Sequence, residues 1–379
     1  MRSLDAARDT CERFHPGLTK ALDALAYDER ERPGSPVIDL FRAHAGVGLL
    51  VPRSFGGSGA DPLEAVRVMR ALGSYSPSLA AGVTMHHFTV AMLYALADEA
   101  GGLTGAQRSL LTDVVPGQRL MASGWAEGRT GQSILTPSVT ARPVDGGYLL
   151  NGAKKPCSLS RSMDLLTASI ALDRPDGGSD LALALVSADS PGLSVHPFWG
   201  NEVLAAAETD EVRLEDVHVP TELVIRSDGD DPERIEELQT AGFIWFELLI
   251  SSGYAGAATA LVEKAVRQNR GSVTDRAALA VSCEAAFALL EGVARAVRDG
   301  LGGEEAVAAV LTARFSAQRT FVRVAADALE LLGGMDFILS SESSRIATSV
   351  RPLAFHPPSR GSSAEALLSY FGGGRLVLG

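Results

Sequence analysis

Apolar positions recur at two different spacings along the chain. Between residues 4 and about 111 they return every three or four residues, as at Val37, Phe41 and Ala45, which places them on one face of a helix. Turn-forming residues interrupt this pattern before Pro62, and proline is suited to the first turn of a helix. The spacing therefore predicts a helical N-terminal region with short loops.

The pattern changes to alternation between residues 121 and about 224. Val212, Leu214 and Val217 alternate with charged residues, and a turn sequence at 145–147 separates two apolar runs. Alternation is typical of strands with one buried face, and a short glycine-containing turn between two such runs predicts a hairpin. Several short strands at this spacing predict a small β-barrel or sandwich.

Helical spacing returns in the last third of the chain. Cys283, Phe287 and Leu290 fall on one stripe, and a second long helical pattern ends at Gly333 and Gly334, as helices commonly end at glycine. We therefore predict a mostly α, α+β fold with three parts: a helical domain at 1–118, a β domain at 119–226 and a four-helix bundle at 227–379.

Composition and charge narrow the function classes. The chain has 379 residues, of which 46% are hydrophobic, and its formal net charge is −12. Such a charge repels the phosphate backbone of nucleic acids, so nucleic-acid binding is not expected. A small anionic ligand is still compatible with this charge, because local arginines and helix N-termini bind anions.

The cysteines and the N-terminus bear on the cellular location. Cys11, Cys157 and Cys283 lie far apart and form no CxxC pair, which predicts neither a disulfide framework nor a zinc site and favours the reducing cytoplasm. The first thirty residues are rich in charge and lack the apolar core of a signal peptide. No apolar stretch is expected to have the length of a membrane span.

The seven histidines form no metal-ligand pattern. His86 and His87 are neighbours, which on a helix point to different faces, so we expect one to be packed and the other solvated. The GxGxxG and GxxxxGK[ST] phosphate-binding patterns are absent, as is the GxSxG pattern of serine hydrolases. The sequence therefore gives no support to a Rossmann, P-loop or serine hydrolase function.

Short motifs in a fixed order give the chain a resemblance to the acyl-CoA dehydrogenase superfamily over nearly its whole length. They include GLLVPRSFGGSGAD in the N-terminal region, EVRLEDVHVP at the exit from the β region, and SSGYAGAATALVEKAVRQNRG and LELLGGMDF in the C-terminal region. The resemblance implies that superfamily's fold and an FAD cofactor. Six residues keep the spacing of its flavin-contacting strands: Glu127, Gly131, Asn151, Gly152, Lys154 and Ser158.

The resemblance also implies which residues contact the flavin. The segment Trp125, Ala126 and Glu127 would lie along the pyrimidine edge of the ring, and Ser158 would lie near N5. Ala126 stands where the family has a hydroxyl, so only its backbone would contribute. Gln132 takes the place of a serine at the pyrophosphate, where its amide is still able to donate a hydrogen bond.

Other positions imply that the rest of FAD is held across a subunit contact. Arg267 matches an arginine that reaches the partner's pyrophosphate. Gly333 and Gly334 match a turn whose backbone approaches the partner's adenosine portion, where glycine allows close contact. Ser362 falls where the family places a hydroxyl near the diphosphate. The resemblance therefore implies a homodimer or a homotetramer.

The position of the usual catalytic base departs from the family pattern. A dehydrogenase of this family removes the α-proton of an acyl thioester with a glutamate, but the matching loop position is Arg360, which is unable to act as a base. Some members carry the glutamate on the preceding long helix, where this chain has Phe246 followed by Glu247. Glu247 is the remaining candidate base, although one step along a helix turns a side chain by about 100°, away from the pocket.

A histidine in the C-terminal loop suggests a different chemistry. The sequence FHPP at 355–358 resembles the His-x-Pro loops of flavin monooxygenases built on the same fold, which use reduced flavin from a separate reductase and form a flavin C4a-hydroperoxide. The resemblance implies that His356 holds or protonates the peroxide, since the pKa of histidine suits such work. Packing of a loop histidine beside two prolines explains the same pattern equally well.

Three functions stay open on the sequence. The first choice is an FAD-dependent oxidoreductase acting on the CH–CH group of an acyl thioester, bound to CoA or to a carrier protein, with an electron-transfer flavoprotein as partner. The second is a two-component flavin monooxygenase that uses O2 and reduced flavin from a flavin reductase on another small molecule. The third is a non-catalytic binding or scaffold protein that has lost flavin turnover.

Overall fold

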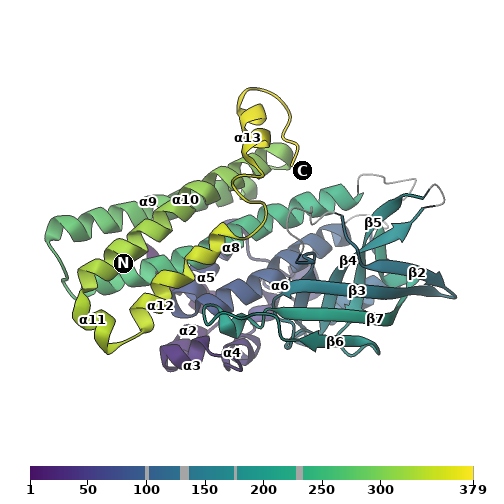
Figure 1. The fold of residues 1–379 in the computed structure, drawn as a ribbon, viewed down its shortest axis with the longest axis horizontal. Coiled ribbons are helices and arrows are strands. Elements are labelled where there is room, and N and C mark those ends of the chain that lie inside the picture. Colours follow the sequence, from purple (N-terminus) through teal and green to yellow (C-terminus); the bar gives the residue numbers. More distant parts are fainter. Residues whose placement is uncertain (99–101, 129–135, 175–176, 228–233, 379) are drawn as a thin grey trace.

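The computed structural model describes residues 1–98, 102–128, 136–174, 177–227 and 234–378. Its elements follow the order that the spacing predicts, with helices first, then strands, then helices (Figure 1). The strands lie at one end of an elongated molecule, and the long C-terminal helices extend away from them. The predicted α+β, mostly helical fold is confirmed.

Capping side chains set where two N-terminal helices begin. The Asp61 carboxylate accepts from the Glu64 backbone N–H, and the Glu64 carboxylate accepts from the Asp61 N–H, so Pro62 lies in the first turn as expected. Ser76 caps the next helix. The helices of this region are α1 (Arg2–Phe14), α2 (Leu18–Asp23), α3 (Tyr27–Glu31), α4 (Val37–Ala43), α5 (Pro62–Tyr75), α6 (Pro77–Ala95) and α7 (Gly105–Thr112).

The strands form one eight-stranded sheet with the order β6-β7-β3-β2-β4-β5-β8, and β1 pairs with β4. Strand β4 runs parallel to β1 and β2, and the remaining pairs are antiparallel. The predicted hairpin is β2–β3, in which Val144 pairs with Gly147. The strands are β1 (Met121–Gly124), β2 (Thr140–Val144), β3 (Gly147–Cys157), β4 (Leu165–Asp173), β5 (Ser179–Ser187), β6 (Leu193–His196), β7 (Asp210–Pro220) and β8 (Val224–Arg226).

Strand β7 shows the predicted alternation with one irregularity. Leu214 and Val217 are both buried although they lie three residues apart, because Asp216 adopts a left-handed backbone with φ 51° and the pairing with β3 shifts there. Asn151 fills the gap, since its amide donates to the Asp216 carboxylate and its oxygen accepts from the Asp216 N–H, both at 2.9 Å. A bulge of this kind re-aims the strand while keeping its apolar face inward.

The C-terminal region contains the long helices, which extend away from the sheet. The stripe predicted around Cys283, Phe287 and Leu290 is buried on one face of its helix, and the helix before Gly333 ends at that residue, where φ is 85°. Its elements are α8 (Arg234–Arg267), α9 (Val273–Arg298), α10 (Gly303–Leu332), α11 (Gly334–Leu339), α12 (Glu342–Ser349), the 3-10 turn η6 (Arg351–Ala354) and α13 (Ala364–Phe371).

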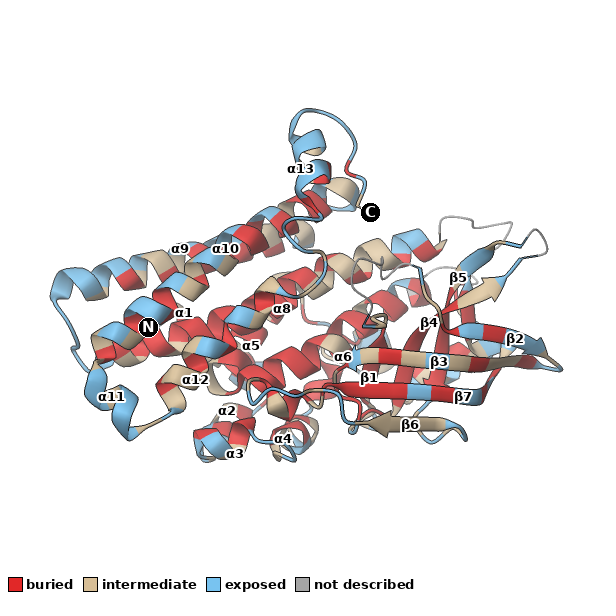
Figure 2. Cartoon of the chain, in the orientation of Figure 1, coloured by how far each residue is buried: buried red, intermediate tan, exposed pale blue. Residues whose placement is uncertain are grey.

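Helix α8 lies in the centre of the molecule and contacts α5, α6, α9 and α10. It approaches α5 so closely that backbones touch: a Cβ on Gly73 would meet the Gly253 carbonyl oxygen at 1.9 Å, and one on Gly256 would meet the Arg70 carbonyl oxygen at 2.1 Å. Only glycine fits at these positions. Figure 2 shows α8 as mostly buried while α9 keeps one open face.

Two expectations from the sequence were wrong. Helices α8 and α9 each contain an 18-residue window that is long and apolar enough to span a membrane. In the protein, 83% of the α8 window and 33% of the α9 window are buried. For α8 this apolarity is that of a core helix packed on several sides. His86 and His87 are both fully buried, because α6 is covered by β1 and by other helices rather than lying at the surface.

Candidate functional site

One wall of the candidate site is the end of strand β3. Ser158 follows its last residue, and its hydroxyl lies 2.9 Å from the Thr209 hydroxyl. Only one hydrogen is shared within such a pair, so the second O–H is available to donate to a ligand. The free donor belongs to one of these two hydroxyls, at the end of β3 that the sequence places beside flavin N5, and it fits a ring whose edge carries acceptor atoms.

The segment after β1 lies beside this strand end. The Ala126 carbonyl accepts from the Lys155 N–H at 2.8 Å, which holds the Trp125 to Glu127 segment against β3. The half-buried Trp125 offers an aromatic surface next to the strand. Its indole N–H has no partner among the described residues, so both its face and its donor fit an aromatic ligand with polar edges.

The carboxylate of Glu127 is used within the protein. It accepts from the Lys154 ammonium at 2.7 Å, from the Ser138 N–H and hydroxyl, and from the Val139 N–H. Lys154 is fully buried and also donates to the Ser169 hydroxyl at 2.9 Å. The hydrogen bonds from Lys154 and Ser138 hold the pKa of Glu127 below its ordinary value against the effect of burial. The side chain of Glu127 therefore holds the predicted flavin-contacting segment in place, and only its backbone is left for the predicted contact.

Helix α6 connects this wall to a second, aromatic one. A Cβ on Gly82 would meet the Leu159 side chain at 3.2 Å, next to Ser158. Phe88 lies six residues further, about 9 Å along the helix axis, and packs edge-on against Phe246 of α8 with ring centroids 5.4 Å apart. Phe246 in turn packs against His356 at 5.7 Å. The aromatic contacts of Phe88 and Phe246, which end in the imidazole of His356, therefore lie further along α6 from the Ser158 end.

His356 belongs to the loop between η6 and α13. Its Nε2 lies 2.9 Å from the Tyr254 hydroxyl. Burial, and then the nearby charge of Arg314, lower the pKa of His356 to about 3. The imidazole is therefore neutral at physiological pH, and burial likewise raises the pKa of Tyr254. Nothing in the described chain bonds to the other ring nitrogen, Nδ1.

The His356 loop is held from beneath by Arg314 of α10. The fully buried guanidinium donates to the carbonyl oxygens of Leu353 at 3.0 Å, Pro357 at 3.4 Å and His356 itself. It also forms an ion pair with Glu247 at 2.6 Å. Burial raises the pKa of Glu247, while Arg314 lowers it. The sequence placed Glu247 away from the pocket, and the structure directs it to this pair rather than to an open cavity.

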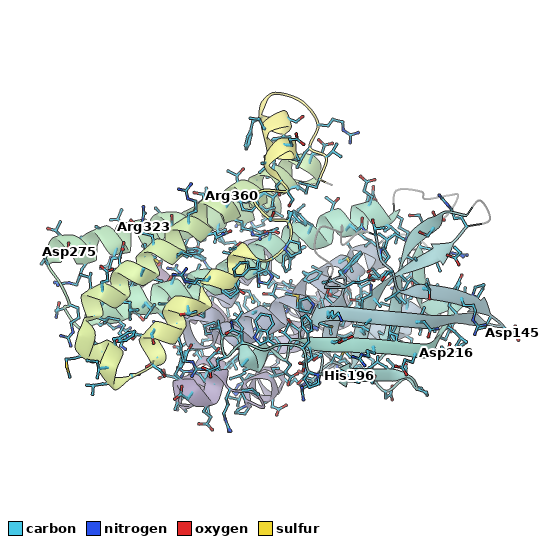
Figure 3. All side chains as sticks on the ribbon, viewed as in Figure 1. Asp145, His196, Asp216, Asp275, Arg323 and Arg360 are labelled. Atoms are coloured by element: carbon cyan, nitrogen blue, oxygen red, sulfur yellow. The ribbon has the colours of Figure 1, made fainter. Side chains whose placement is uncertain are left out.

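Arg360, which the resemblance matches to the loop position of the usual base, is exposed (Figure 3). Ser362 is also exposed, and its N–H and hydroxyl bond to Ser359 of the same turn. Neither residue contacts Glu247 or His356 among the described contacts. Their roles in cofactor binding or catalysis stay predictions.

Three more predicted cofactor residues lie together at the other end of the helices. Arg267 is 65% exposed at the end of α8 and pairs with Glu263 at 3.2 Å. Gly333 and Gly334 lead into α11, which is linked to α8 by an ion pair between Lys264 and Asp336. Figure 1 shows α11 far from the strands. A single chain does not bring these residues to Ser158, as expected if they serve a partner's cofactor. Gly131 and Gln132 lie outside the described residues.

The sequence reasoning missed three site residues: Thr209, Tyr254 and Arg314. Thr209 carried a weak signal because it directly precedes a predicted strand. Tyr254 and Arg314 sit inside helical patterns in which a tyrosine or an arginine is ordinary. Only the arrangement of α8, α10 and the C-terminal loop turns them into partners of His356.

The chain matches a family model and a full-length sequence relative. The acyl-CoA dehydrogenase N-terminal domain family matches residues 4–101. The chain is 62% identical over 378 residues to the isobutylamine N-hydroxylase of Streptomyces viridifaciens, covering 100% of both chains.

Two solved structures have the same fold. The structure of KijD3 in complex with FMN and a dTDP-linked amino sugar superposes with a TM-score of 0.83 at 21% identity, covering 97% of this chain and 94% of that one. XiaF from Streptomyces sp. in complex with FADH2 and glycerol gives 0.80 at 20% identity, covering 100% and 98%. The chain therefore belongs to the acyl-CoA dehydrogenase superfamily of flavin-dependent oxidoreductases, as a divergent member in the same family as the Streptomyces N-hydroxylase.

Proposed function

We propose that this protein is a flavin-dependent monooxygenase that hydroxylates the nitrogen of a small aliphatic amine. The observation that carries the proposal is the 62% identity, over the full length of both chains, to an isobutylamine N-hydroxylase. Identity at this level over both whole chains favours a similar site, formed by the same parts of the chain.

The chemistry of the site supports oxygenation over dehydrogenation. Removal of a thioester α-proton needs a carboxylate that is free to accept it. Phe246 stands at the helix position of that base, Glu247 is paired with Arg314, and Arg360 is an exposed cation. Dehydrogenation of an acyl thioester, the first choice from the sequence, gains no support from this arrangement.

The overall reaction balances with one amine, one O2 and one reduced flavin. Bound reduced flavin supplies two electrons to O2. One oxygen atom is inserted into an N–H bond to give the hydroxylamine, and the other leaves as water with two protons, while the flavin is oxidised. Phe88 and Phe246 provide an apolar surface for the alkyl group, which favours the uncharged amine. His356 offers a hydrogen bond near the aromatic wall.

The cofactor is proposed to be FAD that enters in reduced form from a separate flavin reductase. Ser158 and the Trp125 to Glu127 segment would hold the ring, and Arg267 with the Gly333-Gly334 turn would hold the diphosphate and adenosine portions from a second copy. The exposed guanidinium of Arg267 suits a diphosphate. The cytoplasm is the proposed location, in line with three free, buried cysteines.

A homo-oligomer is proposed because Arg267 and the Gly333-Gly334 turn would hold the FAD of a second copy. Four apolar residues of α11 lie close together and are 59–76% exposed: Met335, Phe337, Ile338 and Leu339. A cluster of that kind beside the Arg267 end marks an association surface. Ile338→Asp combined with Leu339→Asp is expected to lower the mass measured by sedimentation, and an unchanged mass would remove α11 from the interface.

The proposal is tested with purified protein, chemically reduced FAD, isobutylamine and ¹⁸O2. We expect a hydroxylamine that contains one ¹⁸O atom, detected by mass spectrometry. His356→Gln is expected to lower its yield by about 100-fold or more, the usual cost of losing a hydrogen-bond donor that stabilises a reacting group, with H2O2 formed instead. Flavin reduction by isobutyryl-CoA without hydroxylamine formation would overturn the proposal in favour of dehydrogenation.

A further inference from the structure

The direction of the hydrogen bond between Tyr254 and His356 follows from what each group can do. The Tyr254 side chain is 2% exposed, and His356 Nε2 is the one partner of its hydroxyl within the described chain, at 2.9 Å. A buried O–H donor without an acceptor is costly. The hydroxyl therefore donates, and Nε2 accepts.

An imidazole that accepts at Nε2 carries its proton on Nδ1 if it is neutral. The buried guanidinium of Arg314 stands next to this loop and is bound to the His356 carbonyl oxygen. Its positive charge opposes a second proton on the ring, and burial acts in the same direction. Glu247 compensates the charge of Arg314 from the far side. Among the described residues, Tyr254 of α8 bonds to the His356 ring and Arg314 of α10 bonds to its backbone, while Glu247 pairs with Arg314.

We propose that Tyr254 and Arg314 are positioning residues that hold His356 as a neutral donor with its proton on Nδ1. This inference rests on the proposed function, in which His356 serves the oxygen that is transferred to the amine. A neutral N–H donor stabilises a bound oxygen group without giving up its proton. An imidazolium would instead protonate that group and release H2O2, which consumes reduced flavin without product.

The aromatic contacts keep the ring in this orientation. Phe246 packs edge-on against the imidazole, with an interplanar angle of 73°, and the Tyr254 ring lies at 5.8 Å and 44°. Both belong to α8, eight residues apart, while the backbone of His356 is bound to α10 through Arg314. Ring and backbone are thus restrained by different helices, which removes the rotation that would exchange the two nitrogens.

The tautomer is measured by long-range ¹H–¹⁵N correlation spectra of protein labelled with ¹⁵N-histidine, with His356 assigned by its absence in His356→Gln. We expect a protonated Nδ1 and an unprotonated Nε2 in the native protein. In Tyr254→Phe, Nε2 no longer accepts a hydrogen bond from the tyrosine hydroxyl, so the proton is expected to move partly or fully to Nε2. Tyr94→Phe is the matched control, because it removes a buried hydroxyl bonded to the Leu111 carbonyl oxygen and should leave His356 unchanged.

A native Nε2–H tautomer, or a Tyr254→Phe spectrum identical to the native one, would overturn the inference. The charge effect has its own variant: in Arg314→Met combined with Glu247→Gln, the pKa of His356 followed by the same spectra is expected to rise, and no rise would remove Arg314 from the role. These spectra need neither flavin nor amine, so they stand apart from the test of N-hydroxylation. In turnover, Tyr254→Phe should raise the H2O2 share with little change in KM for the amine.

Discussion

The carboxylate of Glu247 and the guanidinium of Arg314 lie 2.6 Å apart, and both side chains are completely shielded from solvent. The pair joins α8 to α10, and Arg314 extends the connection to three carbonyl oxygens of the His356 loop. A charge in such a place is tolerated only because its partner and acceptors are present. The pair is therefore a structural support of the site wall.

Loss of the Glu247 charge tests this support. Glu247→Gln leaves the Arg314 charge uncompensated in the interior, so the free energy of unfolding is expected to fall by about 3–5 kcal/mol, measured by urea denaturation. Glu237→Gln, an exposed position of the same helix, is the control and should change stability by less than about 0.5 kcal/mol. Equal stability of the two variants would show that the ion pair is not formed in solution.

Glu31 predicts a pH dependence of stability. Burial raises its pKa to about 7 from 4.5, against hydrogen bonds from Ser76 and Ser78. Between these two values the native state binds more protons than the unfolded state, so the free energy of unfolding falls as pH rises, by at most about 1.4 kcal/mol per pH unit. In Glu31→Gln this contribution disappears, and urea denaturation at pH 5, 6 and 7 should show a flatter dependence than in the native protein. A variant with the native slope would contradict the assignment.

The α5–α8 contact predicts a steric penalty at Gly256. An alanine there places its Cβ 2.1 Å from the Arg70 carbonyl oxygen, so Gly256→Ala should lower the free energy of unfolding by about 1–3 kcal/mol or more. Gly292→Ala in α9 is the matched control, because no atom lies within 4 Å of its added Cβ. Alanine is the better helix former by about 1 kcal/mol, so this control should not destabilise. Two variants of equal stability would mean that the helices are further apart.

Arg267 is predicted to bind the diphosphate of FAD in a neighbouring copy. Removal of a charge-assisted hydrogen bond costs about 1.5–3 kcal/mol, so Arg267→Ala should weaken FAD binding by about 10- to 100-fold in a fluorescence titration. FMN lacks the second phosphate, and its affinity should change less. Arg298→Ala, at the end of α9, is a control for general loss of charge. Unchanged FAD affinity in Arg267→Ala would remove this residue from the cofactor site.

Local spacing was enough to predict several parts of the fold correctly. The stripe through Cys283, Phe287 and Leu290, the hairpin before Gly147 and the helix end at Gly333 were all predicted correctly. Each depends on neighbours a few residues away, because helix periodicity, turn chemistry and caps act over that distance.

The burial and the contacts of individual side chains were visible only in the tertiary structure. His86 and His87 looked like one packed and one solvated residue, yet α6 is covered on every side that they face. The carboxylate of Glu127 is taken by Lys154 and Ser138, a pairing that the local sequence did not show. Burial is a property of what other elements place around a residue, and no local pattern contains it.

The sequence by itself determined the order of helices and strands and the motifs that mark the superfamily. The tertiary structure decided which side chains meet at His356. Tyr254 lies 102 residues from His356 along the chain, and Arg314 lies 42 residues from it. The folding of α8 and α10 under one loop brings the three together, because hydrogen bonds and charges act over a few ångströms in space whatever their separation along the chain.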